Sequence, residues 1–405
     1  EEELFVHVRS PKPELRKAAY QELHRVYQQD APILGQIYQS IARDWGSEQI
    51  DLRGFSSPLA VRNLANNVPD EVVDTLLGVC RENVSIFHRF FKLKAKWIGM
   101  DRLGRYDLYA PVVETARTYA FQESVDIVLD SFSRFDPKIA KLAARVFDEN
   151  HIDGEPRKGK RGGAFCATVE PALTPWVLQS FTGKPDDVAT MAHELGHAIH
   201  SMLAEHHSAL TQEASLPLAE TASTFAEMLV VDQLLATDPD PELQRDLLFR
   251  QMDHAYASIT RQAYFAVFER EAHQRVKDGG SVDDVTEVYF NSLKEQFADS
   301  VDLSEDFRNE WLRVGHFFFA PFYVYAYSFG QLLVFALYQQ YKAEGEPFKP
   351  RYLEILAAGG SDSPVRILDR AGINVRSAEF WRGGFQVLEE ALERLTSLEV
   401  PAGFG

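Results

Sequence analysis

Cysteine is scarce in this sequence, with only two residues, Cys80 and Cys166, in a chain of 405. Two cysteines cannot cross-link a chain of this length, and they cannot form a thiolate metal cluster. The sequence therefore excludes the disulfide-rich secreted class, and we expect a reducing, cytoplasmic location.

Runs of basic residues are also missing. Lys and Arg total 42 against 60 Asp and Glu, which gives a formal net charge of −18. Binding to nucleic acid or to an anionic membrane surface needs clustered Lys and Arg. We therefore expect neither nucleic acid nor a membrane as a partner.

Long apolar runs are rare, and one uncharged stretch, residues 317–338, has the length of a bilayer-spanning helix. It contains Pro321 and Gly330, and its tyrosines do not form belts at its two ends. This pattern favours a buried helix that lines a cavity, and a membrane span is the alternative.

Most of the remaining sequence has the apolar spacing of amphipathic helices, over residues 15–45, 71–97, 243–277 and 380–398. Residues 160–183 differ, because they hold short strand-forming runs bounded by Gly and Pro. We expect a mainly α protein with one small β-sheet. Pro185, followed by two aspartates, then begins a helix.

That helix carries the pattern H-E-x-x-H at His193, Glu194 and His197. Histidines four residues apart project from one helix face, so both can reach a single zinc ion at about 2.0–2.1 Å. Glu194 lies roughly 100° around the helix from His193, which places its carboxylate beside the metal. A carboxylate there can take a proton from a zinc-bound water.

Zinc needs a third protein ligand and an open fourth position. His200 is too far along the helix, about 10 Å from the first histidine. The metzincin pattern requires Gly at position 200 and His at position 203, where this chain has His200 and Leu203. The remaining option is an acid on a second helix, and Glu220 and Glu227 share one face of residues 216–229. From the residues alone, two solvated acids are an equal alternative.

Three segments resemble the oligoendopeptidase F (PepF, M3B) branch of the M3 family of zinc metallopeptidases: residues 159–166, 191–198 and 218–227. The likeness continues to residues 358–364 and covers nearly the whole chain. It implies a helical gluzincin fold with a small β-sheet beside the H-E-x-x-H helix and a deep substrate cleft. It also implies that His193, His197 and Glu220 bind one zinc ion and that Glu194 is the general base.

Members of that family usually carry a further helical region ahead of the point where this sequence begins. We therefore expect an N-terminal helical part at residues 1–110 and the catalytic domain at residues 111–405. The expected consequence is that one wall of the substrate channel is open, or that the chain is a processed fragment.

An aromatic run at residues 315–327 is a candidate for oxyanion stabilisation. Tyr323 and Tyr327 are spaced to share a helical face, and His316 comes just before them. The resemblance implies that a histidine and tyrosines of this segment contact substrate or oxyanion, and core packing is the alternative. Tyr325 points elsewhere by helical phase, so we expect a structural role for it.

The strand-forming segment suggests how a peptide is held. A strand edge beside the zinc helix can pair with an extended peptide through main-chain hydrogen bonds. Gly162 and Gly163 permit close backbone approach, and Cys166 is expected to be a small buried residue.

The sequence therefore predicts a zinc endopeptidase that cuts internal bonds of short, unstructured peptides. One alternative is a gluzincin dipeptidyl carboxypeptidase, which needs a basic residue to capture the terminal carboxylate, and no such residue can be located from the sequence. The other is a non-catalytic helical peptide-binding protein, which would have no need of Glu194.

Overall fold

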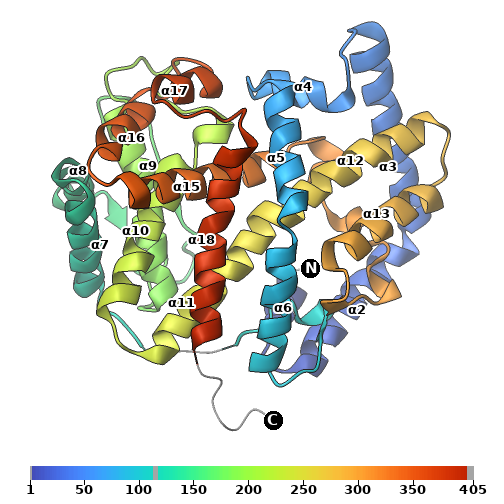
Figure 1. Ribbon diagram of the computed structural model, residues 1–405, viewed down its shortest axis with the longest axis horizontal. Coiled ribbons are helices and arrows are strands. Elements are labelled where there is room, and N and C mark those ends of the chain that lie inside the picture. The colour runs from blue at the N-terminus through green and yellow to red at the C-terminus, as the bar shows by residue number, and fades with distance from the viewer. Residues whose placement is uncertain (1, 113–116, 399–405) are drawn as a thin grey trace. The chain divides into compact units, whose positions relative to one another are not determined.

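The computed structural model describes residues 2–112 and 117–398, and most of them are helical (Figure 1). The chain divides into two compact units. Unit 1 contains Glu1–Glu114, Phe249–Ser328 and Leu388–Gly405, and unit 2 contains Thr115–Leu248 and Phe329–Val387. Both units are discontinuous in the sequence. The division at residues 110 and 111 remains a prediction about the catalytic domain.

Unit 1 is built mainly from helices. They are α1 (Glu2–Val8), α2 (Pro13–Gln29), α3 (Ala31–Trp45), α4 (Pro58–Ala65), α5 (Asp70–Glu82), α6 (Ser85–Trp97), α12 (Arg261–Lys277), α13 (Val282–Phe297) and α14 (His316–Phe319). Two short strands, β1 (Leu103–Gly104) and β5 (Val301–Asp302), pair in parallel. The helix α12 packs against α3, α4, α5 and α13, so its residues are central to the core of this unit.

Unit 2 contains α7 (Phe121–Phe135), α8 (Pro137–Asp148), α9 (Pro185–Leu203), α10 (Thr221–Thr237), α16 (Phe348–Ala357) and α17 (Pro364–Arg370). Its strands are β2 (Ile152–Asp153), β3 (Phe165–Ala167) and β4 (Trp176–Leu178), in the order β2-β4-β3. The pair β2–β4 is parallel and β3–β4 is antiparallel. The predicted small sheet is therefore confirmed, and β3 and β4 pack against α9.

Three further helices contain the boundaries between the units: α11 (Pro241–Ala255), α15 (Tyr325–Glu344) and α18 (Ala378–Ser397). No helix within residues 2–112 and 117–398 is long and apolar enough to cross a membrane. The prediction of one continuous helix over residues 317–338 is wrong. The chain instead forms α14, a turn at residues 320–324, and then α15.

Two other long helical predictions also divide. Residues 15–45 form α2 and α3, because Pro32, in the first turn of α3, has no N–H to donate to the preceding helix. Residues 71–97 form α5 and α6, which meet at Asn83. The Asn83 side chain donates to the Val79 carbonyl, which also accepts from the Asn83 backbone N–H, and this side-chain bond caps the end of α5.

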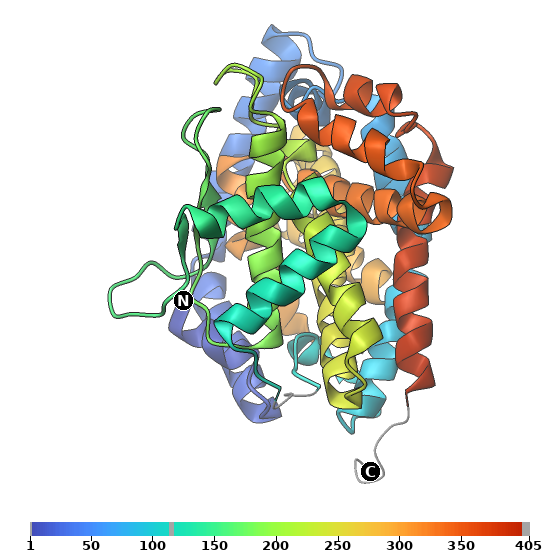
Figure 2. The ribbon, with the colours of Figure 1, turned by 90° about the vertical axis from the view of Figure 1, so that its left-hand side faces the viewer.

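The core of unit 2 surrounds α9 and α10, which lie side by side (Figure 1). The apolar stripe of α9 is fully buried, as its spacing predicts, and it contains Val188, Met191, Ala192, Leu195 and Ile199. The helices α7 and α8 pack on this pair (Figure 2). Phe225 anchors α10 by stacking on Tyr352 at a ring-centroid distance of 4.3 Å.

Candidate metal centre

The start of α9 is fixed by its own first turn. Pro185 occupies the first helical position, where its missing N–H costs no hydrogen bond. The Asp187 carboxylate accepts from the backbone N–H groups of Lys184, at 3.0 Å, and Thr182, at 2.7 Å. A negative charge here also complements the helix dipole. The helix therefore has a defined beginning, which sets the rotational position of the histidines that follow.

His193 and His197 lie on the face of α9 opposite the buried stripe. Their ring centroids are 5.0 Å apart, and their side chains are 27% and 26% exposed. The two imidazoles are thus supported by the helix and still accessible from one side, as a catalytic metal site with an open position requires.

Glu220 completes a cluster of three donor groups. It is the residue immediately before α10, and its Oε2 lies 3.4 Å from Nε2 of His193 and 3.4 Å from Nε2 of His197. Two atoms that are each about 2.0–2.1 Å from a tetrahedral ion are about 3.4 Å apart. One donor atom from each of the three residues lies within 4.8 Å of the others, so this cluster could hold a metal ion.

A close approach between α9 and α10 brings Glu220 to the histidines. A Cβ atom placed on Gly196 would lie 2.5 Å from Ser223 Cα and 2.6 Å from the Ala222 carbonyl oxygen. Only a residue without a side chain permits this contact. The structure therefore places a close contact of the two helices at Gly196.

Ser223 orients the Glu220 carboxylate. Its hydroxyl donates to Glu220 Oε2 at 2.6 Å, which holds the carboxylate in a fixed orientation. Reasoning from the sequence missed this role. The available signal was its spacing, since a serine three residues after an acid can reach it within one helical turn.

Glu227 contacts the other nitrogen of His193. Its Oε2 lies 3.5 Å from His193 Nδ1, while His193 Nε2 faces Glu220. A carboxylate at Nδ1 favours the tautomer that leaves Nε2 unprotonated and able to bind a metal. Burial alone would lower the pKa of His193, but Glu227 and the neighbouring carboxylates outweigh it and raise that pKa.

Glu194 follows His193 and is 6% exposed. Burial raises the pKa of its carboxyl group, with a further contribution from the charge of Glu220, while His193 opposes the change. Glu194 is not one of the three clustered donors. Its charge interacts with those of His193 and Glu220, so it lies near the cluster, and its role as the general base remains a prediction.

The strand β3 lies next to this helix. The hydroxyl groups of Thr168 and Ser201 are 2.6 Å apart and connect the end of β3 to α9. Burial and the charge of Glu194 raise the pKa of Cys166 to about 12, so this thiol is not an activated nucleophile. Within the described residues β3 pairs only with β4, which leaves its other edge without a strand partner.

His316, Tyr323 and Tyr327 form a separate cluster in unit 1. The rings of His316 and Tyr323 are stacked, with centroids 5.2 Å apart and an interplanar angle of 5°. Tyr327 lies 5.9 Å from the first ring and 5.4 Å from the second, and its hydroxyl is 3.5 Å from His316 Nε2. Tyr325 is fully buried and its hydroxyl accepts from Asn66, which agrees with a structural role.

The remaining candidates are not part of the metal cluster. His200 is buried, and burial lowers its pKa to about 4. His207 packs against α16, with its Nε2 3.0 Å from the Ala357 carbonyl oxygen. Neither residue contributes a donor atom to the group of three.

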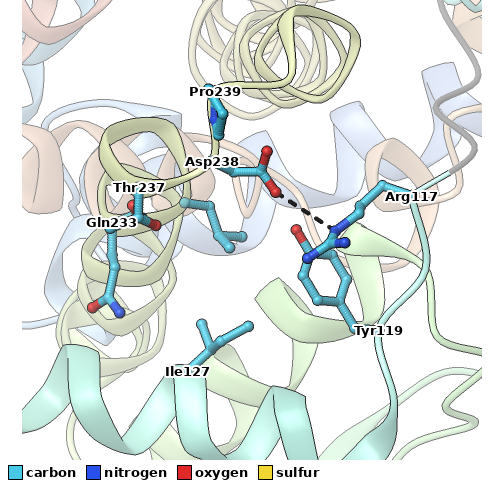
Figure 3. A pocket seen from close by; sticks show the side chains of 8 residues that line it. Arg117, Tyr119, Ile127, Gln233, Thr237, Asp238 and Pro239 are labelled. Carbon is cyan, nitrogen blue, oxygen red and sulfur yellow. Dashed lines mark hydrogen bonds and ion pairs between the residues drawn. The ribbon is translucent and has the colours of Figure 1, made fainter.

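A pocket of about 220 Å³ lies near the C-terminal end of α10 (Figure 3). In it the Arg117 guanidinium faces Asp238, with Nε 3.5 Å from Oδ2, and also lies over the Tyr119 ring. Glu220 precedes the opposite end of α10, roughly 25 Å away along the helix axis. This pocket is therefore distinct from the candidate metal centre.

The H-E-x-x-H helix and the third acid on the next helix define the gluzincin class of metal site. The protein-family model described as Peptidase family M3 matches residues 6–387 of this chain. The chain therefore belongs to that family. It is 27% identical over 390 residues to oligopeptidase PepF of Bacillus subtilis, covering 95% of this chain and 58% of that protein. The chain spans 58–64% of the length of the first curated relatives that it matches.

Solved structures show the same fold. A proposed peptidase from Chlamydophila abortus superposes with a TM-score of 0.91 at 26% identity, covering 98% of this chain and 67% of that one. Oligoendopeptidase-F from Enterococcus faecium gives a TM-score of 0.77 at 23% identity, covering 97% of this chain and 65% of that one. The mainly α M3-type fold is therefore confirmed.

Proposed function

We propose that this chain is a zinc-dependent oligoendopeptidase that hydrolyses internal bonds of short, unstructured peptides. The observation that supports this most strongly is the position of Glu220 Oε2, which lies 3.4 Å from Nε2 of His193 and 3.4 Å from Nε2 of His197. Two nitrogens and one carboxylate oxygen are the donor set that zinc takes in hydrolytic sites. A bound zinc ion supplies a Lewis acid that activates water at neutral pH.

In this proposal Glu194 is the general base. Its buried carboxylate accepts the proton of the attacking water and then passes it to the leaving amine. Glu227 and Ser223 hold His193 and Glu220 in the orientation that the reaction needs.

We assign oxyanion or substrate contacts to His316, Tyr323 and Tyr327. In support, their rings touch one another, and Tyr327 is 41% exposed rather than buried in the core. Burial lowers the pKa of His316, which favours a neutral ring at pH 7. A neutral imidazole and two phenols can each donate a hydrogen bond to developing negative charge.

The edge of β3 is the proposed site for the substrate backbone. An extended peptide that pairs with this edge is held by main-chain hydrogen bonds, which do not depend on its side chains. This mode of binding suits an enzyme that accepts many short peptides. Both cysteines are free, and we propose a reducing, cytoplasmic location.

The test is mass spectrometry of the products formed from a mixed set of unstructured peptides with blocked termini. Internal cuts that disappear with a chelator and return with zinc support the proposal. The matched control is Glu194→Gln, which should keep the bound zinc and lose the activity. Loss of dipeptides only from free C-termini would instead indicate a carboxypeptidase. Absence of cleavage by a zinc-loaded sample would favour a binding protein.

A further inference from the structure

The turn between α14 and α15 contains a strained backbone position. Phe322 has φ of +59°, in the left-handed region, although its side chain is large and fully buried. A bulky residue in this region is a genuine outlier and is under backbone strain. Such strain persists only where surrounding contacts enforce it, and it occurs most often at functional sites.

Two polar side chains hold the peptide group that joins Pro321 to that residue. Glu269, on α12, accepts a hydrogen bond from the Phe322 N–H through Oε1 at 2.8 Å. Arg62, on α4, donates from Nε to the Pro321 carbonyl oxygen at 3.1 Å. The strained turn is therefore held by helices that are distant from it in the sequence.

Glu269 is an unusual residue to find at this position. Its side chain is 0% exposed, and its Oε2 has no hydrogen-bond partner among the described residues. Burial raises the pKa of Glu269 to about 8, against the opposing effects of the Phe322 N–H and Arg62. A buried carboxyl group without a charged partner destabilises a fold. Stability alone does not explain why an acid lies here.

The geometry on the other side of the turn offers an explanation. Tyr323 directly follows the strained residue, and its ring stacks on His316, which lies before the turn. Tyr327 lies after the turn and contacts both rings. If Phe322 relaxed to negative φ, the direction of the chain would change and these rings would separate.

We propose that Glu269 is a positioning residue, which holds Phe322 in the left-handed conformation and so assembles the cluster of His316, Tyr323 and Tyr327. The positioning itself is a structural property of unit 1. Its effect on catalysis rests on the function proposed above for the three rings.

The test compares two conservative variants. Glu269→Gln keeps an acceptor oxygen at the same reach, and it also resembles the protonated acid. Glu269→Asp withdraws the acceptor by about one carbon–carbon bond, ~1.5 Å, which breaks the hydrogen bond to Phe322. Glu271→Gln, on the exposed side of the same helix, controls for a change of charge on α12.

The first readout is the NMR signal of the His316 ring protons in ¹³C-histidine-labelled protein, assigned with His316→Gln. Stacking on Tyr323 shifts these protons through its ring current, so Glu269→Asp should move them and Glu269→Gln should leave them in place. The second readout is peptide hydrolysis. Glu269→Asp should lower kcat by up to about 100-fold with little change in KM, and Glu269→Gln should restore kcat.

The proposal is overturned if Glu269→Asp leaves the His316 signal unchanged, or if Glu269→Gln disturbs it equally. If Glu269→Asp does not fold, Arg62→Met removes the second restraint at a half-buried position and should move the same signal. An unchanged signal in that variant also overturns the proposal. If the wild-type chain hydrolyses no peptide, the NMR result alone decides about positioning, and only the proposed function fails.

Discussion

Replacing Gly196 by alanine tests the packing that brings the third donor to the two histidines. Alanine is the better helix former, so an effect on helix propensity alone would stabilise α9 by about 1 kcal/mol. The structure predicts the opposite result. The new Cβ would lie 2.5 Å from Ser223 Cα and 2.6 Å from the Ala222 carbonyl oxygen, and both atoms belong to the backbone of α10.

The size of the effect follows from these distances. An ordinary contact begins at 3.4 Å, so α10 must move away by about 0.9 Å at this point. Metal ligands tolerate displacements of only about 0.2 Å. Glu220 lies three residues before Ser223 and is hydrogen-bonded to it, so it moves with the helix. We expect Gly196→Ala to lower stability by about 1–3 kcal/mol and zinc affinity by about 10- to 100-fold.

The assays are thermal unfolding of the metal-free protein and zinc titration against a competing chelator. The matched control is Gly383→Ala, at a helical glycine in the same unit where an added Cβ would have no atom within 4 Å. That control should be neutral or slightly stabilising, and it should bind zinc as the wild type does. A Gly196→Ala variant with unchanged zinc affinity would refute the idea that this close approach sets the donor geometry.

Three further outcomes are expected. Ser223→Ala removes the 2.6 Å hydrogen bond to Glu220 and should weaken zinc binding about 10-fold in the same titration, whereas unchanged affinity would mean that this bond does not orient the ligand. Tyr327→Phe should lower kcat by about 100-fold or more with KM nearly constant, and a wild-type kcat would remove its hydroxyl from the mechanism. Glu310 is buried against Arg105; burial alone would raise its pKa, but the surrounding arginines lower it from 4.5 to about 2. This lowered pKa stabilises the fold fully above about pH 4.5, and the free energy of unfolding falls by roughly 3 kcal/mol as the pH drops towards 2. The stability of Glu310→Gln should therefore depend less on pH in this range, as measured by acid unfolding.

The helix that carries the H-E-x-x-H pattern could be predicted accurately, because its signals are local. Pro185 and the aspartates after it mark its start, and the apolar positions recur with the helical period. Strands β3 and β4 of the small sheet were also predictable, since Gly and Pro bound them, whereas β2 lies outside the predicted segment 160–183. The long segments 15–45 and 71–97 were predicted less well. The helical spacing of apolar residues continues across a break when the next helix also buries apolar residues. Only Pro32 marked the break between α2 and α3, and only Asn83 marked the break between α5 and α6.

The aromatic segment shows where local reasoning fails. Helical spacing predicted that Tyr323 and Tyr327 share a face of one helix, but Tyr323 lies in a turn and precedes α15. The rings nevertheless meet, because Glu269 and Arg62 hold the turn in a conformation that its own residues disfavour. These restraining residues come from helices more than 50 and 250 residues away in the chain. No pattern within the segment indicates them.

The sequence by itself determined the chemistry of the candidate centre, because an H-E-x-x-H pattern on a helix places two imidazoles and a carboxylate by covalent spacing alone. It could also name Glu220 as the third donor through a family resemblance, while the residues alone left that choice open. Only the tertiary structure decided that Glu220 lies 3.4 Å from both histidines, that Gly196 permits this approach, and that Ser223 and Glu227 orient the donors. The physical reason is that these distances depend on how two helices pack. Packing is set by side chains across the whole core of the unit and not by the spacing within either helix.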